Sequence, residues 1–258
     1  MKLAFNGYLY EMAVPTNIIM NKEYYHGVYK PSMAQFILDN GIIPPAKKRS
    51  GYFAPVRGMI YLTPDIKYAL YYAKGLDKKQ QIIRYGFIFV VSGNELKDVY
   101  PDEDSIAKLM IDYVHLLYKE EDIKASYITG VKPQDEHISS ICERLFKLLD
   151  RAEILHLRFG PTKFYAGIGK KLLKALSSDE IITIIEQGDA IAHKGFVKPN
   201  SVYVVDKRKI SDNKYTNNNY QFEDYTELIT LDELRKRLNE GKYTDDTPLY
   251  QYGPQGGE

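Results

Sequence analysis

A nearly continuous apolar run between Ile82 and Ser92 constrains the fold more than any other segment. Aromatic and β-branched side chains fill it: Tyr85, Phe87, Ile88, Phe89, Val90 and Val91. Such residues favour strands, and a strand that is apolar on both faces is typical of the middle of a sheet. The turn-forming sequence Gly93-Asn94-Glu95 follows it. We therefore expect a central strand here, with a sheet built around it.

The rest of the chain contributes further strands and many helices. A helix is expected to begin at Pro31 and end before Gly41, and another to begin near Pro64 and end before Gly75. Amphipathic helices, one of them with a capping-box pattern, then fill a block between about residues 104 and 187. Shorter strand patterns lie at residues 24–28, 59–63, 190–197 and 201–206. This order predicts an α+β fold with a helical insertion at about 104–187.

The C-terminal part is expected to be a separate, smaller piece. Thr230 is placed to cap a last amphipathic helix. From Gly241 onward the sequence is polar and rich in glycine and proline, which predicts disorder. We expect one domain over residues 1–212, followed by a C-terminal helix and flexible tail over 213–258.

Composition limits where the protein works. The chain has 258 residues, a net charge of +1 and a single cysteine, Cys142. A nearly neutral protein has no general attraction to nucleic acid or membranes, and a lone cysteine fits a reducing compartment. Neither a signal peptide nor a membrane-spanning run is visible. We expect a cytoplasmic protein without membrane association, and no metal site, because His115, His137 and His156 lack paired ligand spacing.

Three short segments carry the residue types of a ligand pocket. They are Tyr24-Tyr25-His26-Gly27 at a strand, Met59 to Pro64 around Tyr61, and the pair Tyr71-Tyr72 on a helix. Histidine and tyrosine bond hydroxyls, and tyrosine also stacks on rings. Each segment alone has a plainer interpretation. His26 is then a buried histidine bonded to a backbone carbonyl, Tyr61 a core residue, and the tyrosine pair a packed helix face.

Taken in order, the three segments resemble the ADP-ribosyltransferase superfamily, in the branch whose signature is His, Tyr and then an acid. Tyr25-His26-Gly27-Val28 is similar to the family's first motif and Gly58 to Thr63 to its second, while Tyr72 follows Tyr61 by eleven residues. The resemblance covers residues 24–92 and returns weakly at 189–206. It implies a split antiparallel β-sheet core that carries the helical insertion.

The resemblance also implies roles around NAD, which is a substrate in this family. His26 would bond a ribose, and the Gly27 backbone would bond the nicotinamide amide. Tyr61 and Tyr72, with Tyr71 beside it, would hold the nicotinamide ring. The basic tip Lys47-Lys48-Arg49 lies between the two motifs, so Arg49 would contact NAD phosphates or a nucleic-acid acceptor.

One part of the family's pattern is missing. The family's catalytic glutamate stands at or near the start of the closing strand, and no glutamate occupies that position here. The remaining candidates are Asp189, Glu103 and His193. Glu103 has an equally good alternative interpretation, as one of three acids that a helix N-terminus favours. The missing glutamate implies transfer of one ADP-ribose rather than of chains.

These observations together predict an NAD-dependent mono-ADP-ribosyltransferase that releases nicotinamide. We expect a toxin or effector that modifies RNA, DNA or protein and has a neutralising antitoxin as a partner. Two alternatives stay open. One is an NAD enzyme similar to tRNA 2′-phosphotransferases, although the arginine set of that branch is not evident near the motifs. The other is a non-catalytic NAD-binding or partner-binding module of the same fold.

Overall fold

The computed structural model describes residues 19–44, 58–75, 81–97, 99–118, 134–160, 165–188, 190–211 and 221–245. Helices and two antiparallel sheets make up this part of the chain, which confirms the α+β class. The chain divides into two compact units. The sheet unit comprises Glu23–Ile42, Ile66–Ser92 and Val197–Glu258, and the helical unit comprises Met1–Lys22, Ile43–Asp65 and Gly93–Phe196.

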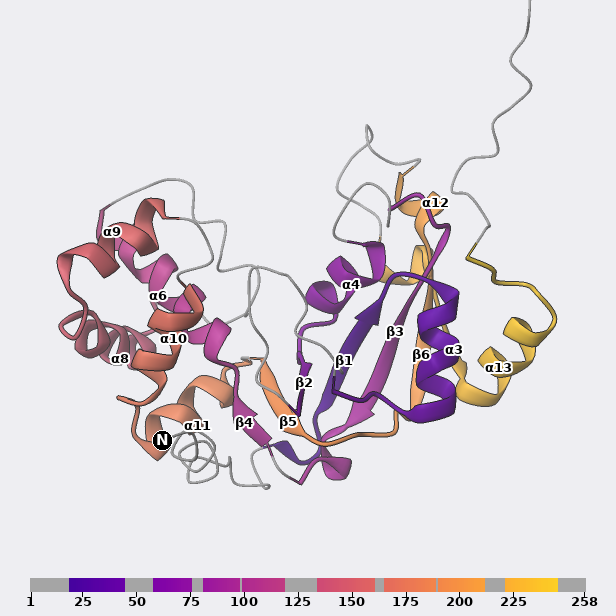
Figure 1. Cartoon of the computed structure of the whole chain (residues 1–258), viewed down its shortest axis with the longest axis horizontal. Coiled ribbons are helices and arrows are strands. Elements are labelled where there is room, and N and C mark those ends of the chain that lie inside the picture. Colours follow the sequence, from indigo (N-terminus) through magenta and orange to yellow (C-terminus); the bar gives the residue numbers. More distant parts are fainter. Residues whose placement is uncertain are drawn as a thin grey trace, which may run out of the picture. The chain divides into compact units, whose positions relative to one another are not determined.

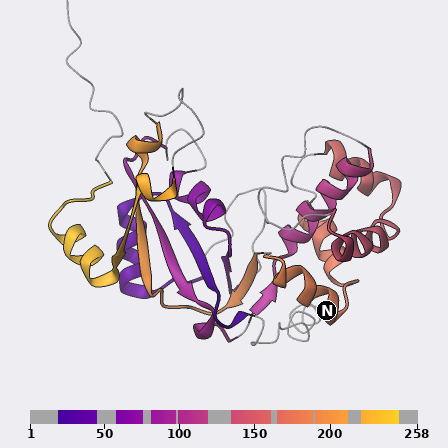
Figure 2. The ribbon, with the colours of Figure 1, turned by 180° about the vertical axis from the view of Figure 1, so that it is seen from behind.

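The sheet unit contains the central strand that the apolar run predicts. Its sheet has the order β1 (Glu23–Val28), β3 (Tyr85–Ser92), β6 (Ser201–Asp206) and β7 (Thr226–Thr230), with every neighbouring pair antiparallel. The strands can be followed from both sides in Figures 1 and 2. β3 is buried along almost its whole length. Its side chains therefore form the middle of the core on both faces of the sheet.

Helix α4 (Ile66–Lys74) lies against one face of this sheet because two glycines let it approach. Methyl groups built on Gly27 of β1 and Gly86 of β3 would overlap the carbonyl oxygens of Ala69 and Ala73, respectively. The helix presents small side chains at the same places, one turn apart. Gly27 therefore has a packing role, whereas the sequence suggested that it leaves room for a ligand.

Helices α3 (Pro31–Asn40) and α13 (Leu231–Asn239) also belong to the sheet unit and contact each other. α3 begins with its proline and ends at Gly41, which has the positive φ of 74° that glycine tolerates. Thr230 caps α13 by accepting a hydrogen bond from the Glu233 amide at 3.2 Å. These helix ends confirm the sequence-based predictions. The short α12 (Lys207–Ser211) and η3 (Phe222–Asp224) complete the unit.

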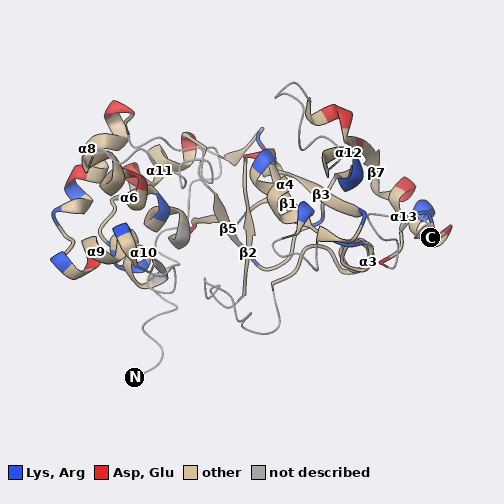
Figure 3. Ribbon diagram, turned by 90° about the horizontal axis from the view of Figure 1, so that it is seen from above, with Lys and Arg blue, Asp and Glu red and all other residues tan. Residues whose placement is uncertain are grey.

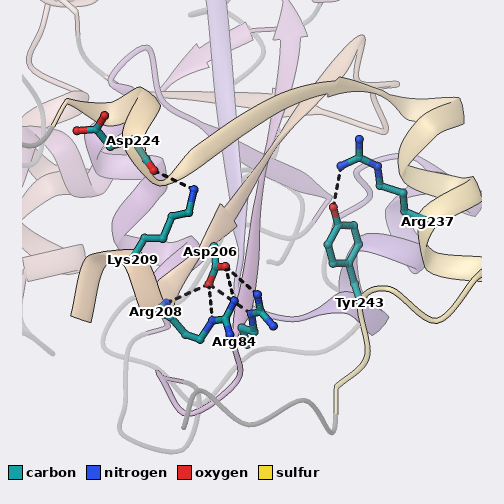
Figure 4. Close-up of polar contacts among 7 residues, drawn as sticks. All are labelled: Arg84, Asp206, Arg208, Lys209, Asp224, Arg237 and Tyr243. Atoms are coloured by element: carbon teal, nitrogen blue, oxygen red, sulfur yellow. Dashed lines mark hydrogen bonds and ion pairs between the residues drawn. The ribbon is translucent and has the colours of Figure 1, made fainter. Parts of the chain in front are cut away.

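The C-terminal segment up to Asp245 is packed, so the prediction of disorder from Gly241 is wrong for this part. Tyr243 is only 4% exposed, and its ring meets those of Tyr85 and Phe87 at centroid distances of 4.7 and 5.8 Å. Its hydroxyl is hydrogen-bonded to Arg237, 3.1 Å away (Figure 4). Asp245 accepts a hydrogen bond from the Ser32 amide at 2.8 Å. Aromatic burial outweighs the polar composition here.

β7 and α13 also change the expected domain boundary. β7 is hydrogen-bonded to β6 from Thr226 to Thr230, and α13 packs on β6 and β7. Residues 221–245 therefore belong to the same unit as the central strand and do not form a separate C-terminal piece. Residues 246–258 lie outside the described part of the chain.

The helical unit holds the second sheet and the helices predicted between residues 104 and 187. Its sheet has the order β2 (Met59–Leu62), β5 (Ile191–Lys194) and β4 (Val99–Pro101), and η1 (Gly93–Glu95) precedes β4. The helices fall between β4 and β5 in the chain. They are α6 (Glu103–Leu117), α8 (Glu136–Phe146), α9 (Arg151–Phe159), α10 (Tyr165–Leu173) and α11 (Ser178–Glu186). None of the described helices combines the length and apolar character needed to cross a membrane.

Two capping boxes fix the beginnings of α9 and α11. Ser177 and Glu180 form the one that the sequence predicts at α11. Asp150 and Glu153 form a matching box at α9, a helix that the sequence interpretation missed. The spacing of an aspartate and a glutamate three residues apart was the available signal.

Cys142 lies on the buried face of α8 and should resist thiol reagents in the folded protein. The side chain is fully buried, and burial, with the Asp112 carboxylate as a second cause, raises the pKa of the thiol to about 12. Because the thiolate is the reactive form, we expect Ellman's reagent at pH 8 to label the native protein only as fast as the helical unit opens. In denaturant it should label one thiol per chain at once. Rapid labelling without denaturant would contradict this burial.

Candidate functional site

His26 and Gly27 lie on β1, which is one of the two edge strands of the four-stranded sheet. They pair with Phe89 and Ile88 of β3. The outer side of an edge strand presents backbone N–H and C=O groups that no neighbouring strand uses. Since successive residues of a strand face opposite sides, the half-buried His26 projects away from the face on which α4 covers Gly27. Among the described strands, none pairs with the outer edge of β1, where the Gly27 backbone lies.

The tyrosines of α4 are on the side of the helix that faces away from the sheet. Ala69, Leu70 and Ala73 form its buried side. Tyr71 is 57% exposed and Tyr72 is 39% exposed. The interpretation of this pair as a packed helix face is therefore wrong.

Tyr72 is held in place by a neighbour one turn earlier. The Tyr68 and Tyr72 hydroxyls are 3.1 Å apart, and their rings meet edge to face at 5.3 Å. The ring of Tyr71 contacts that of Tyr72 at 5.8 Å, also edge to face. Helix α4, which packs on the strand that carries His26 and Gly27, thus presents an oriented aromatic ring on its outward side.

Tyr61 and His193 lie on the second sheet, in the helical unit, and face opposite sides of it. Tyr61 pairs with Ala192 and packs with Met59 and Tyr100, so these side chains share one face. His193 follows Ala192 on β5, projects to the other face and is buried. The structure therefore does not bring His193 to the face that carries Tyr61.

The other predicted site residues lie partly or wholly outside the described part of the chain. Glu103 is the first residue of α6, but its side chain lies outside the described part of the chain. Asp189 and Arg49 lie outside the described residues altogether. Among the described residues, no three His, Cys, Asp or Glu side chains gather as a metal site would require.

A carboxylate that the sequence interpretation missed lies at the start of β1. Glu23 has the same parity in the strand as Tyr25 and Gly27, so it faces the side of the sheet that α4 covers. The Tyr25 hydroxyl donates a hydrogen bond to Glu23 Oε2 at 3.0 Å. Burial, and then this bond, raise the pKa of Tyr25, so the phenol stays protonated. The sequence pattern predicts that the strand begins one residue later, at Tyr24, which leaves Glu23 outside it.

The side chains of the basic run Lys207-Arg208-Lys209 are all hydrogen-bonded to other residues of the protein. The run lies at α12, which is partly blue in Figure 3, and Figure 4 draws the contacts of Arg208 and Lys209. The Lys207 ammonium donates to the Tyr29 carbonyl at 2.9 Å, and burial lowers the pKa of this lysine to about 8. Arg208 and Arg84 both bond the Asp206 carboxylate, with Nη2–Oδ2 distances of 3.1 and 3.0 Å. These arginines hold the ends of β3 and β6 together, which is a structural role.

Comparison with known proteins adds no assignment: no family model, curated protein or solved structure matches the chain. The residues themselves therefore carry the functional argument. In the sheet unit they are an edge strand with His26-Gly27, a neighbouring helix with an oriented tyrosine, and a carboxylate on β1.

Proposed function

We propose that the protein is an NAD-dependent mono-ADP-ribosyltransferase that releases nicotinamide. The observation that carries the proposal is the pairing of β1 with α4. The edge strand offers backbone groups next to His26, and α4, which packs on that strand, contributes the exposed ring of Tyr72. A planar amide-bearing ring needs such a combination, because backbone groups bond its amide while an aromatic face stacks on its ring.

Each group has a distinct task in this proposal. The Gly27 backbone bonds the nicotinamide amide along the outer edge of β1, and Tyr72 stacks on the ring. His26 bonds a ribose hydroxyl. Holding the two halves of NAD in this way orients the bond that breaks, which is the entropic part of catalysis. The role expected for Tyr61 rests on the family resemblance alone.

The resemblance extends the proposal to the acceptor and the partners. The proposed acceptor is a macromolecule, RNA, DNA or protein, and the proposed biological setting is a cytoplasmic toxin or effector neutralised by an antitoxin. The phosphotransferase-like alternative gains no support in the described residues, because Arg84 and Arg208 are bound to Asp206 and do not form a phosphate-binding set.

The test is transfer from NAD labelled in its adenosine half. The protein is incubated with this NAD and a cell lysate, and the labelled product is treated with protease, DNase or RNase to identify the acceptor. We expect His26→Ala and Tyr72→Ala to lower labelling and nicotinamide release by about 100-fold. Phe36→Ala is the matched control, because Phe36 is an exposed aromatic on α3, a helix that contributes none of the proposed NAD contacts.

The outcomes separate the candidate functions. If the wild type binds NAD but never releases nicotinamide with any acceptor, the non-catalytic binding module is correct. If it neither binds NAD nor labels a macromolecule, the family resemblance is a coincidence. Equal loss of activity in Phe36→Ala would mean that the substitutions act through folding.

A further inference from the structure

The chemistry of NAD cleavage is assisted by a carboxylate near the reacting carbon, and no glutamate stands at the position where the family has one. When the bond between C1′ of the ribose and the nicotinamide nitrogen breaks, positive charge develops at C1′ and the ring oxygen. A fixed negative group close to that charge lowers the barrier. His193 projects away from the face that carries Tyr61. The described carboxylates of the sheet unit are therefore candidates for the negative group.

Glu23 has the required position within the sheet unit. It lies on the strand that carries His26 and Gly27, three and four residues earlier, and it shares the α4-covered face with Gly27. At a rise of ~3.3 Å per residue, the Cα atoms of Glu23 and Gly27 are about 13 Å apart along the strand. In the proposed function, NAD extends from the Gly27 backbone along β1, and the glutamate side chain extends from its Cα, so the carboxylate and the ligand are closer than the two Cα atoms. The side chain is exposed, so a ligand along β1 has access to it.

The Glu23 carboxylate is also oriented. The Tyr25 hydroxyl donates to Oε2 at 3.0 Å, and Tyr25 in turn packs on the cluster formed by α4, Ile88 and Val205. An exposed glutamate without such a partner would sample many rotamers. One oxygen is thus fixed by a residue that the core holds in place, while the second oxygen is not engaged by this bond.

A second carboxylate in the neighbourhood provides a comparison. Glu23 and Glu223 both raise the pKa of Tyr203, so both are close to that ring. Glu223 belongs to η3, whereas Glu23 belongs to the strand with the proposed NAD contacts. Only Glu23 of the two is bonded by Tyr25.

We propose that Glu23 is the catalytic carboxylate of the sheet unit and that Tyr25 is its positioning residue. This inference rests on the proposed function. The C1′–nitrogen bond breaks, and its electron pair leaves with nicotinamide, which becomes neutral. Glu23 faces the cation left at C1′. The acceptor, a hydroxyl or amine, adds to C1′ through a lone pair and releases its proton to solvent.

The test compares four variants in steady-state release of nicotinamide, with NAD affinity measured separately by calorimetry. We expect Glu23→Gln to lower kcat by about 100-fold while the KM for NAD changes by less than about threefold. Tyr25→Phe should lower kcat by about tenfold, and Glu23→Asp should recover part of the loss. Glu223→Gln is the matched control and should keep wild-type kcat. Circular dichroism checks that every variant is folded.

Two results would overturn the assignment. The first is an active wild type whose kcat survives Glu23→Gln, which would leave the proposed function intact and remove Glu23 from it. The second is an equal loss in Glu223→Gln, which would mean that general negative charge near Tyr203 matters and not a positioned carboxylate. A wild type that releases no nicotinamide under any condition overturns the proposed function itself, and this outcome is seen before any variant is made.

Discussion

Replacing Gly86 with alanine should destabilise the sheet unit by at least ~2 kcal/mol, the range for overpacking a close contact. The added methyl group would overlap the carbonyl oxygen of Ala73. Ala73 lies in the last turn of α4, so relieving the overlap requires this end of the helix to shift away from β3. Gly27→Ala should act similarly through Ala69. The measurement is denaturant unfolding followed by circular dichroism and tyrosine fluorescence, since the chain has no tryptophan.

A glycine in a different environment provides the control. Gly167 lies in α10, is exposed, and a Cβ there meets nothing within 4 Å. Gly167→Ala should therefore stabilise the protein by about 0.5 kcal/mol, because alanine is the better helix former. If Gly86→Ala were as harmless as Gly167→Ala, the close packing of α4 on the two strand glycines would be incorrect.

The second large effect is expected at the C-terminal anchor. Tyr243→Ala should cost ~3 kcal/mol, the usual scale for removing a buried aromatic ring. The ring is lost from its contacts with Tyr85 and Phe87 on the central strand. The same unfolding experiment measures this loss in the free energy of unfolding. Protease sensitivity near residue 243 should rise in parallel.

A conservative substitution separates the two contributions of this side chain. Tyr243→Phe keeps the ring and loses only the hydrogen bond to Arg237, so it should cost ~1 kcal/mol. A loss as large as that of Tyr243→Ala would show that the hydroxyl, and not the buried ring, anchors the segment. No loss in either variant would mean that the segment is not packed in solution.

The sequence predicts the elements whose signals lie within their own residues. β3 is apolar throughout, so its burial and central position follow from its composition alone. Helix ends at Gly41, Ser177 and Thr230 carry local signals that need no tertiary information. α9 carries such a signal as well, in the capping box of Asp150 and Glu153.

Other elements depend on contacts that a local pattern does not contain. β7 has one buried side chain, Ile229, so its alternation is too weak to predict a strand. Tyr243 lies in a polar segment, and its ring is buried against Tyr85 and Phe87, which precede it by more than a hundred positions. At the site, the sequence identified His26 and Gly27, but the helix above Gly27 and the bond between Tyr25 and Glu23 are tertiary features.

The division of the chain into two units has consequences for its proteolytic fragments and for its folding during synthesis. Each unit is assembled from three separate segments, and the segments of the two alternate along the chain. No single cut therefore releases either unit, and no contiguous fragment consists of one unit alone. Pairings such as that of β1 with β3 must also wait until distant parts of the chain have been synthesised, which slows folding. A cell that makes this protein thus has a long interval in which the chain exists without either unit complete, and activity that depends on the sheet unit cannot arise before Tyr243 has left the ribosome.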